Sequence, residues 1–113
     1  MIYPADIRLR RSNSRTVVRL SGEIDLSNAG MIKRSITESI SNQVLELVID
    51  LGEVRYLDSA GIAMLFDLSR RLAEHEQRFT LVVPSSSLIR RSLEASGWPT
   101  RFPLVERLDE VTG

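Results

Sequence analysis

Residues 44–51 constrain the fold of this chain more than any other segment. They read VLELVIDL, a short run of branched apolar residues between polar turns, which predicts a strand covered on both faces. Segments with apolar residues at helical spacing precede and follow it, at 27–40 and 60–73. A strand between two helices joins its neighbours through crossovers, so the pattern predicts a mostly parallel sheet with helices packed on it and 44–51 near its centre.

Branched and alternating apolar residues predict three further strands, at 7–11, 16–23 and 79–83. The polar turn between the first two predicts that they pair as a hairpin. In the helical segment that follows them, Leu26 and Met31 are expected to widen the buried face.

A last helix is expected near the C-terminal end. It should begin at Ser86 or Ser87, where a hydroxyl can cap it, and end before Gly97. The tail after it has room for a short strand and a final helical turn. The predicted fold class is therefore α/β, a single domain over residues 1–113. Its mixed, mostly parallel β-sheet has an N-terminal hairpin and helices packed against it.

Composition excludes several kinds of site. The chain has no cysteine and one histidine, His75, which leaves no thiolate or disulfide chemistry and almost no material for paired-imidazole metal sites or Ser-His-Asp triads. Fifteen Lys and Arg balance fifteen Asp and Glu, and the arginines are scattered without a stripe, which argues against direct nucleic-acid binding. No segment approaches the ~20 apolar residues of a membrane span. The sequence predicts a soluble, cytoplasmic protein without membrane insertion, metal or cofactor.

The most informative segment is the junction at residues 49–62, which is expected to run from the buried strand through a short loop into a helix. Asp58 or Ser59 is a natural N-cap there. Ala60 and Gly61 are small, so they leave the Ser59 hydroxyl open to the active site of another protein. A plain helix-capping role is the alternative interpretation of the same residues.

A second acidic turn, Gly-Glu-Ile-Asp at residues 22–25, ends a strand and precedes the first helix. In a wound sheet this turn can bring Asp25 to the same rim as Asp58. Two carboxylates near one exposed hydroxyl predict a recognition surface.

With these motifs the chain resembles the STAS domain family, and within it the bacterial anti-sigma factor antagonists. The resemblance covers nearly the whole length: the LSGEID turn, the segment VIDLGEVRYLDSAGIAML, the strand FTLVV and the third helix with its glycine turn. It departs from many members at Ala60, where a second hydroxyl residue is common, and at Ala63, where glycine is common among antagonists.

The resemblance implies a binding protein without enzymatic activity. Its partner would be an anti-sigma factor with serine kinase activity, which phosphorylates the serine after the motif aspartate, here Ser59. The unphosphorylated form binds the anti-sigma factor and frees the sigma factor, and a phosphatase resets the phosphorylated form. ATP and Mg²⁺ would belong to the kinase. A phosphate is tolerated at a helix N-terminus, so the switch is expected to act on binding and leave the fold intact.

The expected partner-binding surface centres on the junction and includes the acidic turn: Glu23, Asp25, Asp58, Ser59, Ala60, Gly61 and Ile62. One alternative is the STAS subunit of a phospholipid-transport ABC system, which binds the transporter ATPase. Another is a small hydrolase with Ser59 as nucleophile, for which the chain offers few bases. The sequence gives no prediction of oligomeric state.

Overall fold

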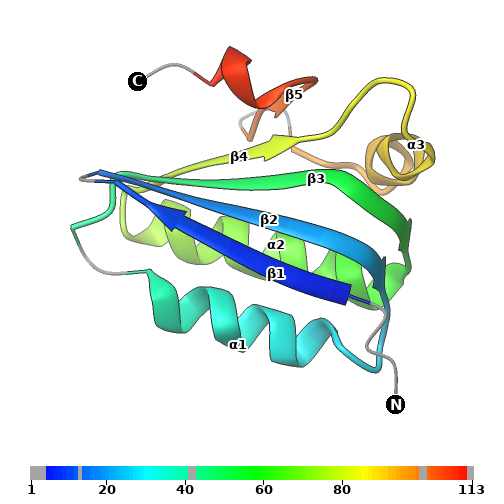
Figure 1. The fold of residues 1–113 in the computed structure, drawn as a ribbon, viewed down its shortest axis with the longest axis horizontal. Coiled ribbons are helices and arrows are strands. Elements are labelled where there is room, and N and C mark those ends of the chain that lie inside the picture. Colours follow the sequence, from blue (N-terminus) through cyan, green and yellow to red (C-terminus); the bar gives the residue numbers. More distant parts are fainter. Residues whose placement is uncertain (1–4, 13, 41–42, 100–101, 112–113) are drawn as a thin grey trace.

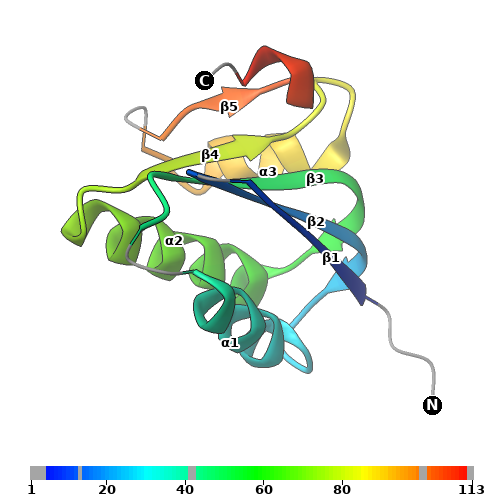
Figure 2. The ribbon, with the colours of Figure 1, turned by 60° about the vertical axis from the view of Figure 1, so that its left-hand side comes forward.

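The computed structural model describes residues 5–12, 14–40, 43–99 and 102–111. Within them the chain forms a five-stranded sheet with strand order β1-β2-β3-β4-β5. The elements in chain order are β1 (Ala5–Arg11), β2 (Arg15–Ile24), α1 (Ala29–Ser39), β3 (Glu46–Leu57), α2 (Ser59–Glu74), β4 (Arg78–Val82), α3 (Leu88–Ala95), β5 (Leu104–Val105) and the 3₁₀ turn η1 (Leu108–Glu110). Helices α1 and α2 lie on one side of the sheet and η1 on the other (Figures 1 and 2).

The sheet is mixed, as the sequence predicts. Strand β1 pairs antiparallel with β2 in the N-terminal hairpin, and each later pair of neighbours is parallel. The predicted turn of this hairpin is closed by a hydrogen bond from the backbone N–H of Ser12 to the carbonyl of Arg15 (2.9 Å), while Asn13 lies outside the described residues.

Strand β3 is central and buried, which confirms the first prediction, but it is longer than expected. Its residues 46–51 are buried on both faces. The expected loop at 52–57 is wrong, because β3 stays paired with β2 to its last residue, Leu57. Two register shifts each give β3 one residue more than β2, as β-bulges do. Gly22 of β2, beside the second shift, has φ +92°, a conformation that favours glycine.

The helices bury the faces that their apolar spacing predicts. Residues Ala29, Ile32 and Ile36 of α1 are buried, and α2 buries its apolar side in the same core. Leu26 and Met31 are exposed, so the expectation that they widen the buried face of α1 is wrong. Leu26 lies in the turn before α1, where helical spacing does not apply.

Helix α3 begins and ends as predicted. The Ser87 hydroxyl accepts from the backbone N–H of Ile89 (3.3 Å), and Gly97 follows the helix with φ +82°. Trp98 then packs its ring against Phe66 of α2, with centroids 5.0 Å apart, so the end of α3 is fixed to the core. No helix in the described part of the chain is long and apolar enough to cross a membrane.

An ion pair joins the two helices on the same side of the sheet. Lys33 of α1 donates to a carboxylate oxygen of Asp67 in α2 (3.1 Å), and this hydrogen bond holds the pKa of Asp67 below its usual range. A lowered pKa means that the ionised form stabilises the fold. That stabilisation is present above the ordinary Asp pKa of about 3.9 and is lost as the pH falls through the lower folded value.

We expect Asp67→Asn to lower the free energy of unfolding at pH 7 by up to about 1 kcal/mol, because both side chains are partly exposed. In urea unfolding, the difference from the wild type should shrink as the pH falls below about 3.9. The matched control is Glu38→Gln, an exposed carboxylate of α1, which should leave the unfolding free energy unchanged at both pH values. A deficit of Asp67→Asn that stays constant down to pH 2 would contradict this role.

Candidate functional site

Asp58 caps the N-terminus of α2. One carboxylate oxygen, Oδ1, accepts from the backbone N–H groups of Ala60 (2.9 Å) and Gly61 (3.1 Å). The sequence predicts either Asp58 or Ser59 as the N-cap, and the structure shows that it is Asp58. Ser59 is therefore the first residue of the helix, and it is exposed.

The other oxygen of Asp58 reaches the turn between β2 and α1. Its Oδ2 accepts from the backbone N–H of Leu26 (3.2 Å), and the Asp58 N–H donates to the carbonyl of Ile24 (3.2 Å). The start of α2 and the turn that carries Asp25 are thus hydrogen-bonded to each other. The structure brings the two acidic turns together at one rim of the sheet, as their positions after parallel strands predict.

The carboxylate of Asp25 is held within its own turn. Its Oδ1 accepts from the backbone N–H of Ser27 (2.9 Å) and from the Ser27 hydroxyl (2.5 Å). Glu23, by contrast, is exposed at the end of β2. The rim therefore presents one carboxylate at a strand end, one in the turn and one at the helix start.

Asn28 is a residue that the sequence interpretation missed. It is buried, its side-chain oxygen accepts from the backbone N–H of Asp25 (3.0 Å), and its amide donates to the carbonyl of Glu23 (2.9 Å). It precedes α1 but makes no side-chain capping bond to that helix. Its position before an apolar helix is a capping signal in the sequence, yet its bonds fix the acidic turn.

Gly61 has a packing role beyond keeping Ser59 open. A Cβ at this buried position would lie 2.4 Å from Leu57 Cδ1 and 3.0 Å from Ile24 Cγ2. The absence of a side chain thus allows the first turn of α2 to lie directly on the ends of β2 and β3. Ala60 and Ile62 are half-buried, so Ser59 is the most accessible residue of this turn.

Large apolar side chains are exposed near this rim. Leu26 is 82% exposed, Tyr56 51% and Met31 49%. Leu26 is bonded through its backbone to Asp58, and Tyr56 lies opposite Glu23 in the register of β2 and β3. We call Leu26, Tyr56 and Met31, which lies in the first turn of α1, the apolar rim; exposed apolar side chains beside polar groups are typical of protein-binding surfaces.

The site offers Ser59 no imidazole base. His75 follows the last residue of α2 and its Nδ1 lies 2.8 Å from the carbonyl of Arg71. Ser59 begins this helix and His75 follows its end, sixteen positions later, so the two residues lie roughly 24 Å apart at about 1.5 Å per residue. No group of three or more potential metal ligands occurs in the part of the chain that the structure describes. The arrangement suits recognition of the Ser59 hydroxyl rather than its use as a nucleophile.

Three comparisons place this geometry among known proteins. Residues 6–111 match the family model described as STAS domain. The chain is 33% identical over 102 residues to the anti-sigma-F factor antagonist RsfB of Mycobacterium tuberculosis, covering 89% of this chain and 82% of the relative. A crystal structure of an anti-sigma factor antagonist from Mycobacterium paratuberculosis has a TM-score of 0.82 at 28% identity, covering 94% of this chain and 89% of that one.

The same fold occurs in SpoIIAA of Bacillus. Its structures in the unphosphorylated and phosphorylated forms have TM-scores of 0.77 and 0.72, each at 22% identity. Both cover 93% of this chain, and 91% and 95% of their own chains.

The packing at the start of α2 predicts that Gly61→Ala is destabilising. The added methyl group would displace Leu57 and Ile24 in the core, at a cost of about 1–3 kcal/mol. Gly30→Ala is the matched control, because its Cβ would meet nothing within 4 Å in α1; it should stabilise the protein by about 0.5–1 kcal/mol. Chemical unfolding of both variants measures the difference, and equal stabilities would show that Gly61 does not set this packing.

Proposed function

Because this chain belongs to the STAS domain family, we propose that it is an anti-sigma factor antagonist, which binds an anti-sigma factor and so frees a sigma factor. The observation that carries the proposal is the 33% identity with RsfB, which extends over 89% of the chain. The structural likeness to the antagonist from Mycobacterium paratuberculosis supports it over a similar length. RsfB and the mycobacterial structure are anti-sigma factor antagonists, and no structural observation favours the transporter-subunit alternative.

The proposed binding surface is the rim around Ser59. It includes Glu23, Asp25 and residues 58–62, to which the structure adds the apolar rim. Exposed aromatic and aliphatic side chains supply the apolar area that a partner can bury, and a few such side chains usually dominate the binding energy. Polar and charged groups around them set the orientation of the partner.

The proposed switch is phosphorylation of Ser59 by an anti-sigma factor with serine kinase activity. Three features support it: Ser59 is exposed, it is the first residue of α2, and its neighbour Asp58 holds the helix start in place. SpoIIAA, which shares the fold, has a phosphorylated form. A phosphatase that removes the phosphate would return the protein to its binding form.

A phosphate on Ser59 is expected to act on binding alone. Phosphorylation adds about −1.5 to −2 charges at pH 7, and a helix N-terminus favours negative charge. We expect the fold to remain intact, because Ser59 is exposed and its phosphate would stay in solvent. A partner surface that buries a neutral hydroxyl beside the apolar rim would have to desolvate the phosphate without a counter-charge, which costs several kcal/mol.

Phosphorylation is tested by incubating the purified chain with ATP and each candidate serine-kinase anti-sigma factor of its genome, followed by intact mass and peptide mapping. One phosphate is expected, on Ser59. Ser59→Ala should remain unmodified, and Ser86→Ala, which removes another exposed serine, should be phosphorylated like the wild type. A phosphate on a different serine, or none with any candidate, would contradict the switch.

Leu26, the most exposed residue of the apolar rim, provides a test of whether this rim belongs to the binding surface. Leu26→Ser should weaken binding to the anti-sigma factor by about tenfold or more, because the partner loses a buried contact of roughly 1.4 kcal/mol. Leu45→Ser is the control, since Leu45 is 59% exposed but precedes β3, at the opposite end of that strand from Asp58. Titration calorimetry measures both, and equal affinities of the two variants would exclude Leu26 from the interface.

A further inference from the structure

Five arginines gather on the N-terminal hairpin, although the sequence spreads them among other residues. Together they line a groove of about 530 Å³: Arg8, Arg10, Arg11, Arg15 and Arg19. We call this the arginine groove. The expectation that the arginines form no stripe is wrong, because the antiparallel register brings the two strands together and places Arg8 directly opposite Arg19.

Carboxylates balance only part of this charge. Arg15 pairs with Glu46 (3.0 Å) and Arg19 pairs with Asp50 (3.3 Å). Arg8 pairs with Asp6 (3.4 Å). Among the described residues, Arg10 and Arg11 have no carboxylate partner. The groove therefore carries excess positive charge on a chain whose formal net charge is zero.

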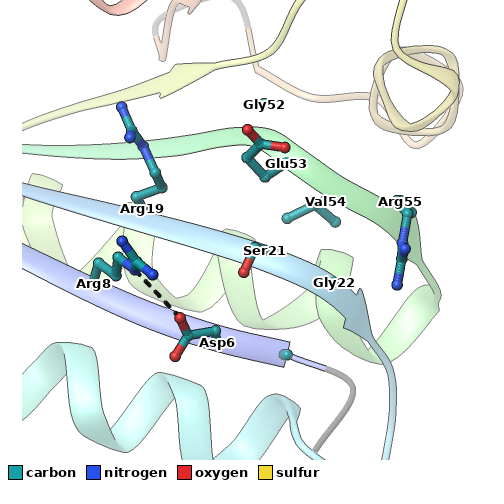
Figure 3. Close-up of a pocket in the computed structure, with 10 residues that line it drawn as sticks. Asp6, Arg8, Arg19, Ser21, Gly22, Gly52, Glu53, Val54 and Arg55 are labelled. Atoms are coloured by element: carbon teal, nitrogen blue, oxygen red, sulfur yellow. Dashed lines mark hydrogen bonds and ion pairs between the residues drawn. The ribbon is translucent and has the colours of Figure 1, made fainter.

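A second groove adjoins the arginine groove and differs from it in charge. It has a volume of about 620 Å³ and shares Arg8 and Arg19, but Asp6 and Glu53 also line it (Figure 3). Because this second groove is lined by residues of both charges, it favours neither an anionic nor a cationic ligand. The described lining of the arginine groove contains no carboxylate and includes the apolar residues Val17 and Leu108. In the hairpin register Val17 lies opposite Arg10, so their side chains share one face of the sheet, whereas Leu9 and Arg11 lie opposite the buried Val18 and Thr16 and point to the other face.

We propose that the arginine groove is a docking site for an acidic segment of a partner protein that also carries apolar side chains. Carboxylates of the segment would pair with Arg10 and with Arg8, whose ion pair with Asp6 is exposed; this is a charge-complementary contact. Its apolar side chains would pack on Val17 and on Leu108 of η1, both of which are half-buried. Strand β1 lies at the edge of the sheet, so an extended segment can also bond to its free backbone edge.

A protein segment fits this groove better than a nucleic acid. Proteins that bind single strands stack bases on aromatic side chains, and the described lining of the groove has none. Its apolar side chains suit leucine-like residues, which a nucleic acid lacks.

The groove is independent of the proposed switch. Strand β2 begins at the hairpin turn and ends at Ile24, which is bonded to Asp58. The arginine groove contains the start of this strand and Ser59 lies beyond its end. A partner on the rim around Ser59 would leave the groove free for a second contact.

The test is an NMR titration of the isotope-labelled, full-length chain at low salt with a short synthetic peptide of aspartate, leucine and serine. We expect amide shifts confined to β1, the start of β2 and η1, and weaker binding as salt rises. A peptide with serine in place of leucine should bind more weakly. Oligothymidylate, a nucleic-acid probe, should bind more weakly than the leucine-containing peptide.

Arg10→Glu should lower the affinity for the peptide by about tenfold, and Arg8→Glu, on the same face of β1, is a second variant with the same expected effect. Arg34→Glu, which reverses an exposed arginine of α1, is the matched control and should bind like the wild type. The proposal is overturned if the peptide shifts no groove residues, if both reversals bind like the control, or if oligothymidylate binds more tightly than the peptide.

Discussion

The carboxylate of Asp58 is the interaction on which the arrangement of the rim depends. Through one oxygen it satisfies two N–H groups at the start of α2, and through the other it holds the turn between β2 and α1. Asn28 fixes the same turn from inside, and the lack of a side chain at Gly61 lets the helix approach the strand ends. Ser59 thus lies at a hydrogen-bonded junction of three elements, which suits a residue that is recognised by geometry and charge.

The acidic residues of the rim and the arginines of the groove lie toward opposite ends of β2. Glu23, Asp25 and Asp58 lie at the rim where β2 and β3 end, whereas the arginine groove occupies the hairpin where β2 begins. A net charge of zero conceals this separation. Opposite surfaces at opposite ends allow two protein contacts that do not compete for space.

The sequence predicts the parts of the structure that follow from periodicity. The buried apolar run that ends at Leu51 and the helical spacing of α1 and α2 were sufficient to predict the α/β fold. Because parallel strands end at the same edge of a sheet, their order was also sufficient to predict that Asp25 and Asp58 lie at one rim. The extension of β3 was not predictable from Gly52 and Glu53, because two bulges preserve its pairing with β2 despite exposed polar residues. The arginine groove and the bonds of Asn28 depend on cross-strand register and on contacts between side chain and backbone, which residue spacing does not encode.

The central claim is that a phosphate on Ser59 changes binding and leaves the fold intact. The most direct measurement is calorimetric titration of the anti-sigma factor with the unphosphorylated chain and with the chain phosphorylated at Ser59, together with thermal melts of both forms. The account predicts a loss of affinity of about a hundredfold or more, with melting temperatures that agree within about 2 °C. Equal affinities, or a loss of binding accompanied by a clearly lower melting temperature, would contradict it.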